Sequence, residues 1–553
     1  MRTLALTLIF ATAAVFAQSN ATDSALEGYV VDATQAFVSG AKITARNIRT
    51  NVASNTVTSD AGYYRFPLLP VGEYEVTVLA TGFREYRQSG ISLAVGRQVR
   101  VDAALQVGSA ADSITVTADA SIVETGQTAS GEVINSRSVR NLPIVSRNVY
   151  NFNLLGPGVK GIPSTGFGTT QFTFGGTSRA SWNTDGLDNS QRRTNRQIRL
   201  VINTPEAIEE SQVLSNGYSA EFGRAAGGQI NIITRSGTNE FHGSGMFLYR
   251  FRDLQARPSL AARNPERTWK DAAFTLGGPI LKNRLFFFAQ YEYNPYTLPT
   301  AISISNANAS ALGLPASELG NSPFGEDFRT SMMKVSYQLN DKNSGFFRYS
   351  RFTNEQPNGA GGLTVPSRGV NFLDRMNGGA FQLATTISPT TLNEFRFGIN
   401  RRHELRDAVG LPSSGNPAVD IASVANIGVN PLAGVENIEQ STQFIDNFTK
   451  TTGKHTLKAG TDIQLTDYKL NSSLDRRFTF QGVAAVAGVR GAVSPLDQYL
   501  NTVRSVIDPA TGRPFTYTQL SLQTGDRFLA LNYKFLNFFA LDEFRITPRF
   551  TLN

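Results

Sequence analysis

The 553-residue chain contains no cysteine, only three histidines and few charged residues. The absence of cysteine excludes disulfide frameworks, thiolate zinc sites, iron–sulfur clusters and thiol nucleophiles. His242, His403 and His455 are far apart in the sequence. We therefore expect them to lie in the strands that form the wall of the fold or in loops, and we expect no metal site. Charged residues make up 17% of the chain, against about 25% in ordinary soluble proteins. The chain therefore lacks the surface charge typical of soluble proteins.

Long apolar runs are also missing beyond the N-terminus. No later stretch approaches the ~18 uncharged apolar residues of a membrane-spanning helix. The mean hydropathy of -0.19 is likewise too polar for a bundle of such helices. Lipid cannot satisfy the hydrogen-bonding groups of an open strand edge. If the mature protein lies in a membrane, it must therefore form a closed β-barrel.

The N-terminus has the three parts of a secretory signal peptide. Arg2 precedes an apolar run from Leu4 to Phe16, and a small residue follows at Ala17. We expect residues 1–17 to be removed by cleavage after Ala17. A retained membrane anchor is the alternative, but the run is too short to span a bilayer comfortably.

Aromatic residues and glycine are abundant, with 37 Phe, 17 Tyr and 49 Gly. This mixture is typical of pleated strands with aromatic bands and tight turns, so we expect a mainly β fold. A single compact domain is unexpected at this length. The net charge of +8 is dispersed among polar residues, which argues against a nucleic-acid partner.

Residues 24–108 contain seven short alternating segments divided by turns, which predicts an antiparallel β-sandwich. In the string SDAGYYRFPLLPVGEYEVTVLATGF, glycines 62, 72 and 82 are expected at turns, and Tyr74, Val76 and Val78 are expected to face inward. This string resembles the carboxypeptidase regulatory-like domain, a transthyretin-type sandwich without catalytic residues. The resemblance implies a spacer or recognition module; a carbohydrate-binding role for such folds is analogy.

Residues 109–118 form a small-residue linker followed by an extended β-branched segment. The segment looks like a TonB box, the peptide by which outer-membrane receptors pair with the energy-transducing protein TonB. Such a peptide needs only a tether and an extended backbone that can add to the edge of a partner's sheet. An ordinary first strand of the next domain explains the same string equally well. The candidate residues are Asp112, Ser113, Ile114, Thr115, Val116, Thr117 and Ala118.

Residues 119–236 change character, with two short helical patterns around Pro143 followed by glycine-rich strands. Their motifs resemble the plug domain of TonB-dependent receptors of the Oar-like group, in which a regulatory-like sandwich precedes the plug. The matching features are Leu142-Pro143, Arg147-Asn148, Pro157-Gly158-Val159, Asp185-Gly186 and the string YSAEFGRAAGGQINIITRSGTNEFHG from Tyr218 to Gly243.

The last of these strings is interpreted as the junction between plug and barrel. Its glycines, including Gly223, are expected to allow a turn with positive φ and close backbone approach before a strand from Gln229 to Thr234. Two of its charged residues are close enough for an ion pair that would seat the plug in a lumen. The junction residues are Glu221, Arg224, Gly227, Gly228 and Asn231.

Residues 237–553 read as long strands with apolar and polar residues in alternation. In TLNEFRFGINR, Phe395, Phe397 and Ile399 are expected to face lipid, opposite Glu394 and Arg396. We count eleven or twelve such strands, whereas a plugged receptor has about twenty-two. The sequence therefore predicts an incomplete barrel from a fragment of a longer protein. The stretches 301–327 and 356–375 are expected to be long outer loops.

One basic cluster in the plug region could face an anionic ligand or the acidic lumen; a solvated loop explains it as well. It consists of Arg192, Arg193, Arg196 and Arg199. Asp185 and Asp188 lack the distal glutamate of a calcium loop. No GxSxG, Walker A or HExxH motif is found. We therefore expect neither an enzyme nor a cofactor.

The resemblance implies an outer-membrane receptor of a Gram-negative bacterium. TonB, energised by the inner-membrane complex, would pull the box and displace the plug, admitting a large or scarce substrate. Outer-membrane lipid would surround the barrel, and the substrate would be a carbohydrate, a peptide, a siderophore or another large or scarce molecule. Two rivals remain: an outer-membrane adhesion or structural protein without transport, and a secreted glycan-binding protein made of several sandwiches.

Overall fold

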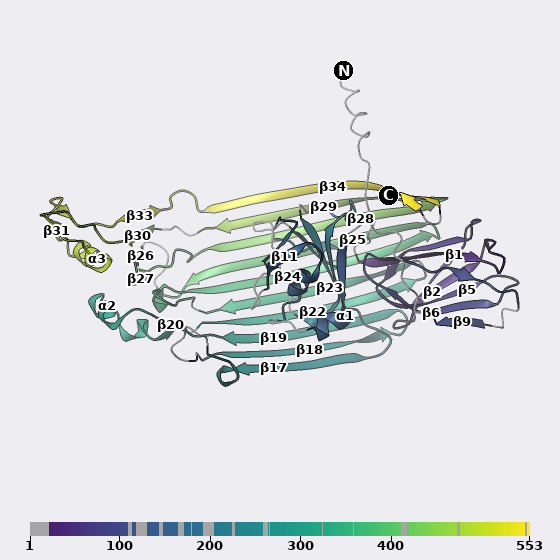
Figure 1. Cartoon of the computed structure of the whole chain (residues 1–553), viewed down its shortest axis with the longest axis horizontal. Coiled ribbons are helices and arrows are strands. Elements are labelled where there is room, and N and C mark those ends of the chain that lie inside the picture. Colours follow the sequence, from purple (N-terminus) through teal and green to yellow (C-terminus); the bar gives the residue numbers. More distant parts are fainter. Residues whose placement is uncertain are drawn as a thin grey trace, which may run out of the picture.

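A computed structural model describes residues 22–108, 113–117, 130–142, 147–163, 171–177, 180–191, 204–223, 227–257, 264, 266–322, 324–357, 359–410, 417–472, 476–547 and 550–552. The expected signal peptide, residues 1–17, lies outside them. The fold is mainly β, as expected. It has three parts: an N-terminal sandwich (residues 22–108 with 113–117), an inner unit (130–234) and a large sheet (242–552) (Figure 1).

The N-terminal sandwich has two sheets around an apolar core that includes Tyr74, Val76 and Val78, all facing inward as expected. One sheet contains β4 (Tyr63–Pro70), β1 (Asp23–Val31), β7 (Gln98–Arg100) and β8 (Ala103–Ala104). The other has the order β3 (Ala53–Val57), β2 (Lys42–Asn47), β5 (Gly72–Leu79), β6 (Glu85–Leu93) and β9 (Ser113–Thr117).

The expectation of an entirely antiparallel sandwich for residues 24–108 was wrong at β1. β1 pairs in parallel with β7 and β8, because the chain crosses from one sheet to the other after β6 and returns beside β1 in the same direction. β9 also pairs in parallel with β6. Gly62 and Gly82 have φ values of 67° and 86° and form turns where the sequence predicts them.

The inner unit is a five-stranded sheet with short helices and one separate hairpin. The sheet order is β10 (Ser130–Asn135), β15 (Ile208–Asn216), β16 (Gly228–Thr234), β13 (Ala180–Thr184) and β14 (Leu187–Asp188), and the hairpin joins β11 (Val159–Ile162) to β12 (Gln171–Phe174). The helices are α1 (Ser136–Asn141), η1 (Val149–Leu155) and η2 (Pro205–Ala207). The first two lie on either side of position 143, as the helical patterns predict. Tyr150, Phe172 and Trp182 pack together in its core.

The large sheet contains eleven antiparallel strands joined in sequence order, in agreement with the expected eleven or twelve. They are β17 (His242–Phe251), β18 (Thr268–Leu281), β19 (Leu285–Thr297), β22 (Gly325–Asn340), β23 (Asn343–Gln356), β24 (Val370–Ser388), β25 (Thr391–Ala408), β28 (Glu436–Thr452), β29 (His455–Asn471), β34 (Phe528–Thr547) and β35 (Phe550–Leu552). His242, His403 and His455 lie in these strands, as predicted for wall residues.

Short turns join the strands at one end of the large sheet, and long connections join them at the other. The N-terminal sandwich lies at the short-turn end (Figure 1). The long connections pack into a loop cluster with its own apolar core around Ile304, Ile421 and Phe480. The loops are shorter than expected, since β22 begins at Gly325 and β24 at Val370, and the ends of both expected loops are paired strand residues.

The elements in these connections are short. They are η3 (Arg252–Leu254), β20 (Thr300–Ala301), α2 (Asn306–Ala311), η4 (Ala316–Glu318), β21 (Asn321–Ser322), η5 (Pro366–Arg368), β26 (Ala418–Ile421), β27 (Ala425–Gly428), β30 (Arg476–Phe480), α3 (Pro495–Val503), β31 (Ile507–Asp508), β32 (Arg513–Pro514) and β33 (Gln519–Leu522). No helix of the described ranges is both long and apolar enough to traverse a bilayer.

The large sheet exposes apolar side chains on its outer face and buries many polar ones on its inner face, beside a cluster of buried Phe and Met residues. Phe274 and Phe538 are 60% and 72% exposed on its outer face, whereas Lys334 and Arg396 on the inner face are 5% and 1% exposed. Phe395, Phe397 and Ile399 lie opposite the buried Glu394 and Arg396, as the alternation predicts. A soluble sheet has the reverse polarity. This arrangement is typical of a wall that meets lipid on one side.

Candidate functional site

The inner unit contacts the large sheet through buried polar side chains, first of all through Asp185. Asp185 and Gly186 form the tight turn between β13 and β14, with φ values of 48° and 73°. Glycine adopts this left-handed conformation freely, and aspartate tolerates it better than most residues. The Asp185 carboxylate accepts hydrogen bonds from the backbone N of Thr234 at 2.9 Å and from its hydroxyl at 2.7 Å. The carboxylate is thereby fixed to the end of β16.

Two cations of the large sheet meet this carboxylate. Lys334 Nζ of β22 lies 3.5 Å from Asp185 Oδ1, and Arg348 Nη1 of β23 bonds Asp185 Oδ2. Lys334 also donates to the backbone oxygen of Thr234 at 3.0 Å. All of these charged side chains are buried. Removing one partner of such a buried pair typically costs ~3–5 kcal/mol. We call Asp185, Thr234, Lys334 and Arg348 the Asp185 latch.

A second contact lies around Arg147, which the sequence places in a plug motif. Arg147 Nη2 lies 2.7 Å from Glu206 of η2, and Arg147 Nε lies 2.9 Å from Asp271 of β18. Close by, the hydroxyl of Thr204 bonds the carboxylate of Glu292 in β19. An arginine and a hydroxyl of the inner unit thus meet two buried carboxylates of the wall.

A third contact uses neutral amides around Asp188 in β14. The backbone N of Asp188 donates to Gln443 Oε1 at 2.8 Å, and Gln464 Nε2 donates to its carboxylate at 3.0 Å. Asn400 Nδ2 donates to the Asp188 backbone oxygen at 3.2 Å. Neither Asp188 nor Asp185 belongs to a metal cluster, and none occurs elsewhere in the described part of the chain.

The predicted junction residues are placed in part. Glu221 forms an ion pair of 2.5 Å with Lys458 of β29, while its expected partner Arg224 lies outside the described residues. Asn231 Oδ1 accepts a hydrogen bond from the backbone N of Gly186 at 3.3 Å. Glu221 and Asn231 therefore contact the wall and the latch turn, respectively.

The expectation of positive φ at the junction glycines was wrong for Gly223 and Gly228, neither of which has it. The expectation of close approach is met at Gly228, where a Cβ atom would overlap the ring of Phe174. Glycine is needed there because an aromatic ring of β12 covers the start of β16. Gly227 lies beside it and lines a shallow hollow with Phe174 and Tyr218.

The N-terminal sandwich is fixed to the large sheet by a second set of buried charges. Arg65 Nη1 lies 2.6 Å from Glu543 and 3.3 Å from Glu27. Arg545 of β34 lies 3.2 Å from Glu27, and its guanidinium sits 3.7 Å from the centre of the Tyr63 ring. Burial raises the pKa of the Tyr63 hydroxyl, so Tyr63 stays neutral. These contacts join β1 and β4 of the sandwich to β34.

The sandwich also contacts the inner unit. Arg49 lies 3.2 Å from Glu209, and the backbone N of Val95 donates to Glu210 Oε2 at 2.6 Å. Gln212 Nε2 donates to the Val95 backbone oxygen at 3.2 Å. Both carboxylates and Gln212 lie in β15. The sandwich is therefore held by the wall and by the inner unit at once.

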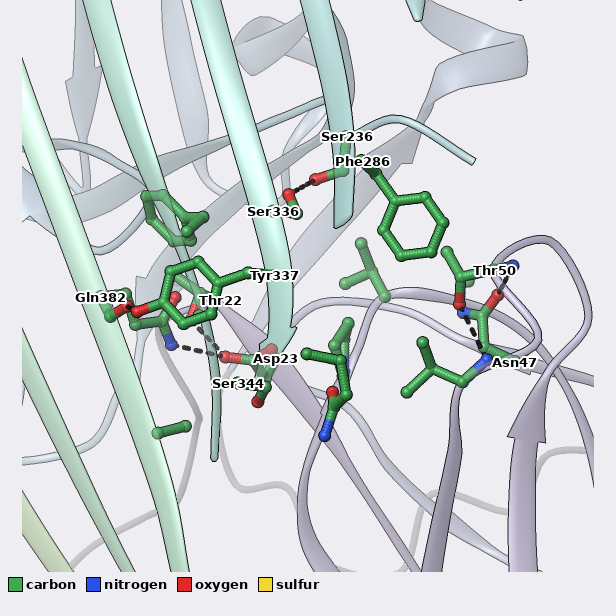
Figure 2. A pocket seen from close by; sticks show the side chains of 18 of the residues that line it. Thr22, Asp23, Asn47, Thr50, Ser236, Phe286, Ser336, Tyr337, Ser344 and Gln382 are labelled. Carbon is green, nitrogen blue, oxygen red and sulfur yellow. Dashed lines mark hydrogen bonds between the residues drawn. The ribbon is translucent and has the colours of Figure 1, made fainter. Parts of the chain in front are cut away.

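A cavity of about 220 Å³ lies where the sandwich, the inner unit and the large sheet meet. Figure 2 shows Gln382 bonded to Asp23 beside Thr22 on one side of it, and Ser336 bonded to Ser236 on another side. Burial and the nearby Glu394 raise the pKa of Asp23 to about 6, against the opposing effect of the hydrogen bond from Thr22. The cavity is lined by both polar and apolar side chains, and the sandwich forms one side of it.

The candidate TonB-box segment lies on the sandwich. Five residues of β9 pair in parallel with β6, from Ser113 opposite Glu85 to Thr117 opposite Ser89. Asp112 and Ala118 lie outside the described residues, as do Arg192, Arg193, Arg196 and Arg199. The segment pairs with the sheet of the sandwich and not with the sheet of the inner unit. Its interpretation as the first strand of the next domain was therefore wrong.

Two family models match the chain. One described as "Outer membrane beta barrel domain" matches residues 233–309 and 296–553. One described as "Carboxypeptidase regulatory-like domain" matches residues 25–106, within the N-terminal sandwich. The first match covers more than half of the chain and corresponds to the large sheet and its loop cluster.

Known proteins with similar sequences are receptors and transporters. The chain is 28% identical over 299 residues to the TonB-dependent transporter Oar of Myxococcus xanthus, which covers 50% of this chain and 27% of Oar. It is 36% identical over 90 residues to the probable TonB-dependent siderophore receptor PirA of Acinetobacter baumannii, covering 16% of this chain and 11% of PirA. The chain thus spans well under half the length of either relative.

The fold is similar to that of the outer membrane transporter YddB from Escherichia coli. The match has a TM-score of 0.54 at 11% identity and covers 75% of this chain and 54% of YddB. At this identity the similarity concerns the fold alone.

Proposed function

Since this chain belongs to the outer membrane β-barrel family, we propose that it contains the sandwich, the plug and wall strands of a TonB-dependent receptor. The protein is located in the outer membrane of a Gram-negative bacterium. In this proposal the inner unit is the plug, the large sheet is part of the wall, and residues 112–118 are the segment that TonB captures. The loop cluster faces outward and meets the substrate, and the sandwich lies on the periplasmic side.

The observation that carries the proposal is the Asp185 latch. The plug is held on the wall by a few buried polar clusters: the latch, the Arg147 contact and the Asp188 amides. When the plug moves, water can hydrogen-bond the groups that are uncovered, so displacement costs less than exposing an apolar core of the same area. Such a seat is stable at rest and can be opened by force and formed again.

Capture by TonB explains why no chemical energy source is needed in the chain. TonB would add residues 113–117 to the edge of its own sheet and pull, and the load would reach β10 through residues 118–129. The substrate would be carried through the space that the displaced plug leaves. Carbohydrate, peptide and siderophore cargo all remain compatible with this path.

The experiment uses the full-length receptor in isolated outer membranes and the purified C-terminal domain of TonB from the same organism. We expect the receptor to retain this domain and a deletion of residues 112–118 to lose the interaction. Ile114→Pro should lose it as well, because proline removes a backbone donor and disfavours strand addition. Ala110→Pro, in the preceding linker, is the matched control and should bind normally.

The same deletion separates transport from adhesion. A receptor without residues 112–118 should lose energy-dependent uptake while remaining in the outer membrane. If TonB is not retained even by the unmodified receptor, and the deletion leaves attachment to cells or matrix intact, the protein is an adhesion protein and the proposal fails.

A further inference from the structure

The proposed TonB-binding segment is already a member of a β-sheet. β9 is the last strand of the five-stranded sheet of the N-terminal sandwich, and all five of its residues have partners on β6. Its backbone groups on that side are therefore engaged by the protein itself. Strand addition to a partner uses the same kind of backbone group.

The sandwich that holds β9 is itself anchored. Arg65 and Glu27 contact Glu543 and Arg545 of the wall, and Val95 bonds Glu210 and Gln212 of the inner unit. A load applied to β9 while it is paired with β6 passes first into these sandwich contacts. It reaches β10 of the inner unit only when β9 has separated from the sandwich.

We propose that β6 of the N-terminal sandwich is a docking edge for residues 113–117, and that β6 and TonB compete for this strand. The inference rests on the proposed function and assigns the sandwich a role in it. With β9 on β6 the receptor is uncoupled, and when TonB takes the strand the inner unit is coupled to the pull. The sandwich thereby prevents an idle receptor from being opened.

The short pairing between β6 and β9 is suited to replacement by pairing between β9 and TonB. Five paired residues at the edge of a sheet form one of the less stable elements of a fold, because an edge strand is paired with a neighbour on one side only. Only residues 109–112 connect the end of the sandwich at Gly108 to β9. They can span roughly 13 Å when extended, so a released strand stays near β6 and can return.

The test locks β9 on β6 with a disulfide. Arg87 and Thr115 are directly opposite in the register, and neighbouring strands lie ~4.8 Å apart, within the range of a disulfide. The native chain has no cysteine, so Arg87→Cys with Thr115→Cys gives one defined pair. Arg87 is partly exposed and its ion pairs lie at the surface, so its replacement should change stability little.

A matched control places a disulfide in the same sandwich away from β9. Thr44 and Asn55 are opposite each other on β2 and β3, and the Thr44→Cys, Asn55→Cys variant should behave like the native protein when oxidised. Each full-length variant is incubated with the TonB C-terminal domain before and after reduction, and bond formation is counted by mass spectrometry of the peptides.

We expect the oxidised Arg87→Cys, Thr115→Cys variant to bind TonB at least tenfold more weakly than the same protein after reduction, with no change in the control. Equal binding by the oxidised and reduced forms would mean that TonB adds to the open outer edge of β9, which overturns the competition. Loss of binding in the reduced variant and in the native receptor alike would instead overturn the proposed function.

Discussion

At the scale of single residues, the attachment of the inner unit to the large sheet depends on charges that are buried in pairs. Asp185→Asn keeps the shape of the side chain but leaves Lys334 and Arg348 buried together without their carboxylate. We expect the inner unit to be loosened by about 3 kcal/mol. Hydrogen exchange of β16 in the purified receptor measures this, and β16 should exchange faster by roughly two orders of magnitude.

The control for this variant is Asp253→Asn, which breaks a surface pair with Arg252. Exposed pairs contribute ~0–1 kcal/mol, so exchange of β16 should not change. Unchanged exchange in Asp185→Asn as well would show that the latch does not hold the inner unit.

Asp23 gives a second prediction at this scale, through its pKa of about 6. Because this value lies above the ordinary 3.8, the docked sandwich binds the proton more tightly than the undocked or unfolded chain. The contribution of Asp23 to the stability of the docked sandwich should therefore be greatest at low pH, fall as the pH rises from about 4 to 6, and stay constant above. Asp23→Asn should remove this contribution to the fall and stabilise the docked sandwich at pH 7.5 by about 1–3 kcal/mol.

Hydrogen exchange of β1 at pH 5 and pH 7.5, corrected for the intrinsic exchange rate, checks this prediction. Asp60→Asn changes an exposed carboxylate of the same sandwich and should keep the native pH dependence. Less protection in Asp23→Asn than in the native protein at pH 7.5 would contradict the predicted sign.

The residues that attach the inner unit to the large sheet could be predicted from the sequence only in part. The Asp185-Gly186 pair predicts a turn, and the turn is present. Its cations come 149 and 163 residues later, and no spacing rule connects positions so distant. Lys334 and Arg348 carried one local signal: each is a charged residue on the inward side of a strand whose alternate residues are apolar. Asp271 and Glu292 carried the same signal.

At the scale of elements, alternation predicted most of the strands but not all of their partners. The large sheet could be expected because its strands follow one another and pair with their sequence neighbours. The parallel partners of β1 and the docking of β9 on β6 could not, because they depend on where the chain crosses between sheets. The junction glycines were recognised, but the reason for Gly228 is a packed ring, which only the fold supplies.

Gly228 gives a prediction at the element scale. Gly228→Ala places a methyl group in the space of the Phe174 ring, so β12 must shift away from β16. We expect a loss of about 1–3 kcal/mol in the stability of the inner unit, measured by thermal unfolding of the purified receptor. Adding Phe174→Leu should recover part of this loss, since the smaller side chain can yield.

Gly379→Ala is the matched control in the large sheet. Its new methyl group would meet Ile399 at an ordinary contact distance of 3.4 Å, so the unfolding temperature should hardly change. Equal effects of Gly228→Ala and Gly379→Ala would show that the ring of Phe174 does not restrict β16.

At the scale of the whole molecule, the proposed location of the large sheet in a membrane is supported by its polarity, which is the reverse of that of a soluble sheet. The large sheet exposes Phe274, Phe347 and Phe538 and buries Lys334 and Arg396, which would be unstable in water and is favourable in lipid. The sandwich and the inner unit have ordinary apolar cores. The outer-membrane family match agrees with this division. It argues against the alternative of a secreted glycan-binding protein made of several sandwiches.

The most direct test of this account measures which face of the large sheet meets lipid. Because the native chain has no cysteine, single spin labels can be placed at positions 394 to 399 of β25 in the full-length receptor in lipid vesicles. Accessibility to oxygen, which concentrates in lipid, should be high at 395, 397 and 399 and low at 394, 396 and 398. High oxygen accessibility at the even positions, or none of the twofold alternation, would contradict it.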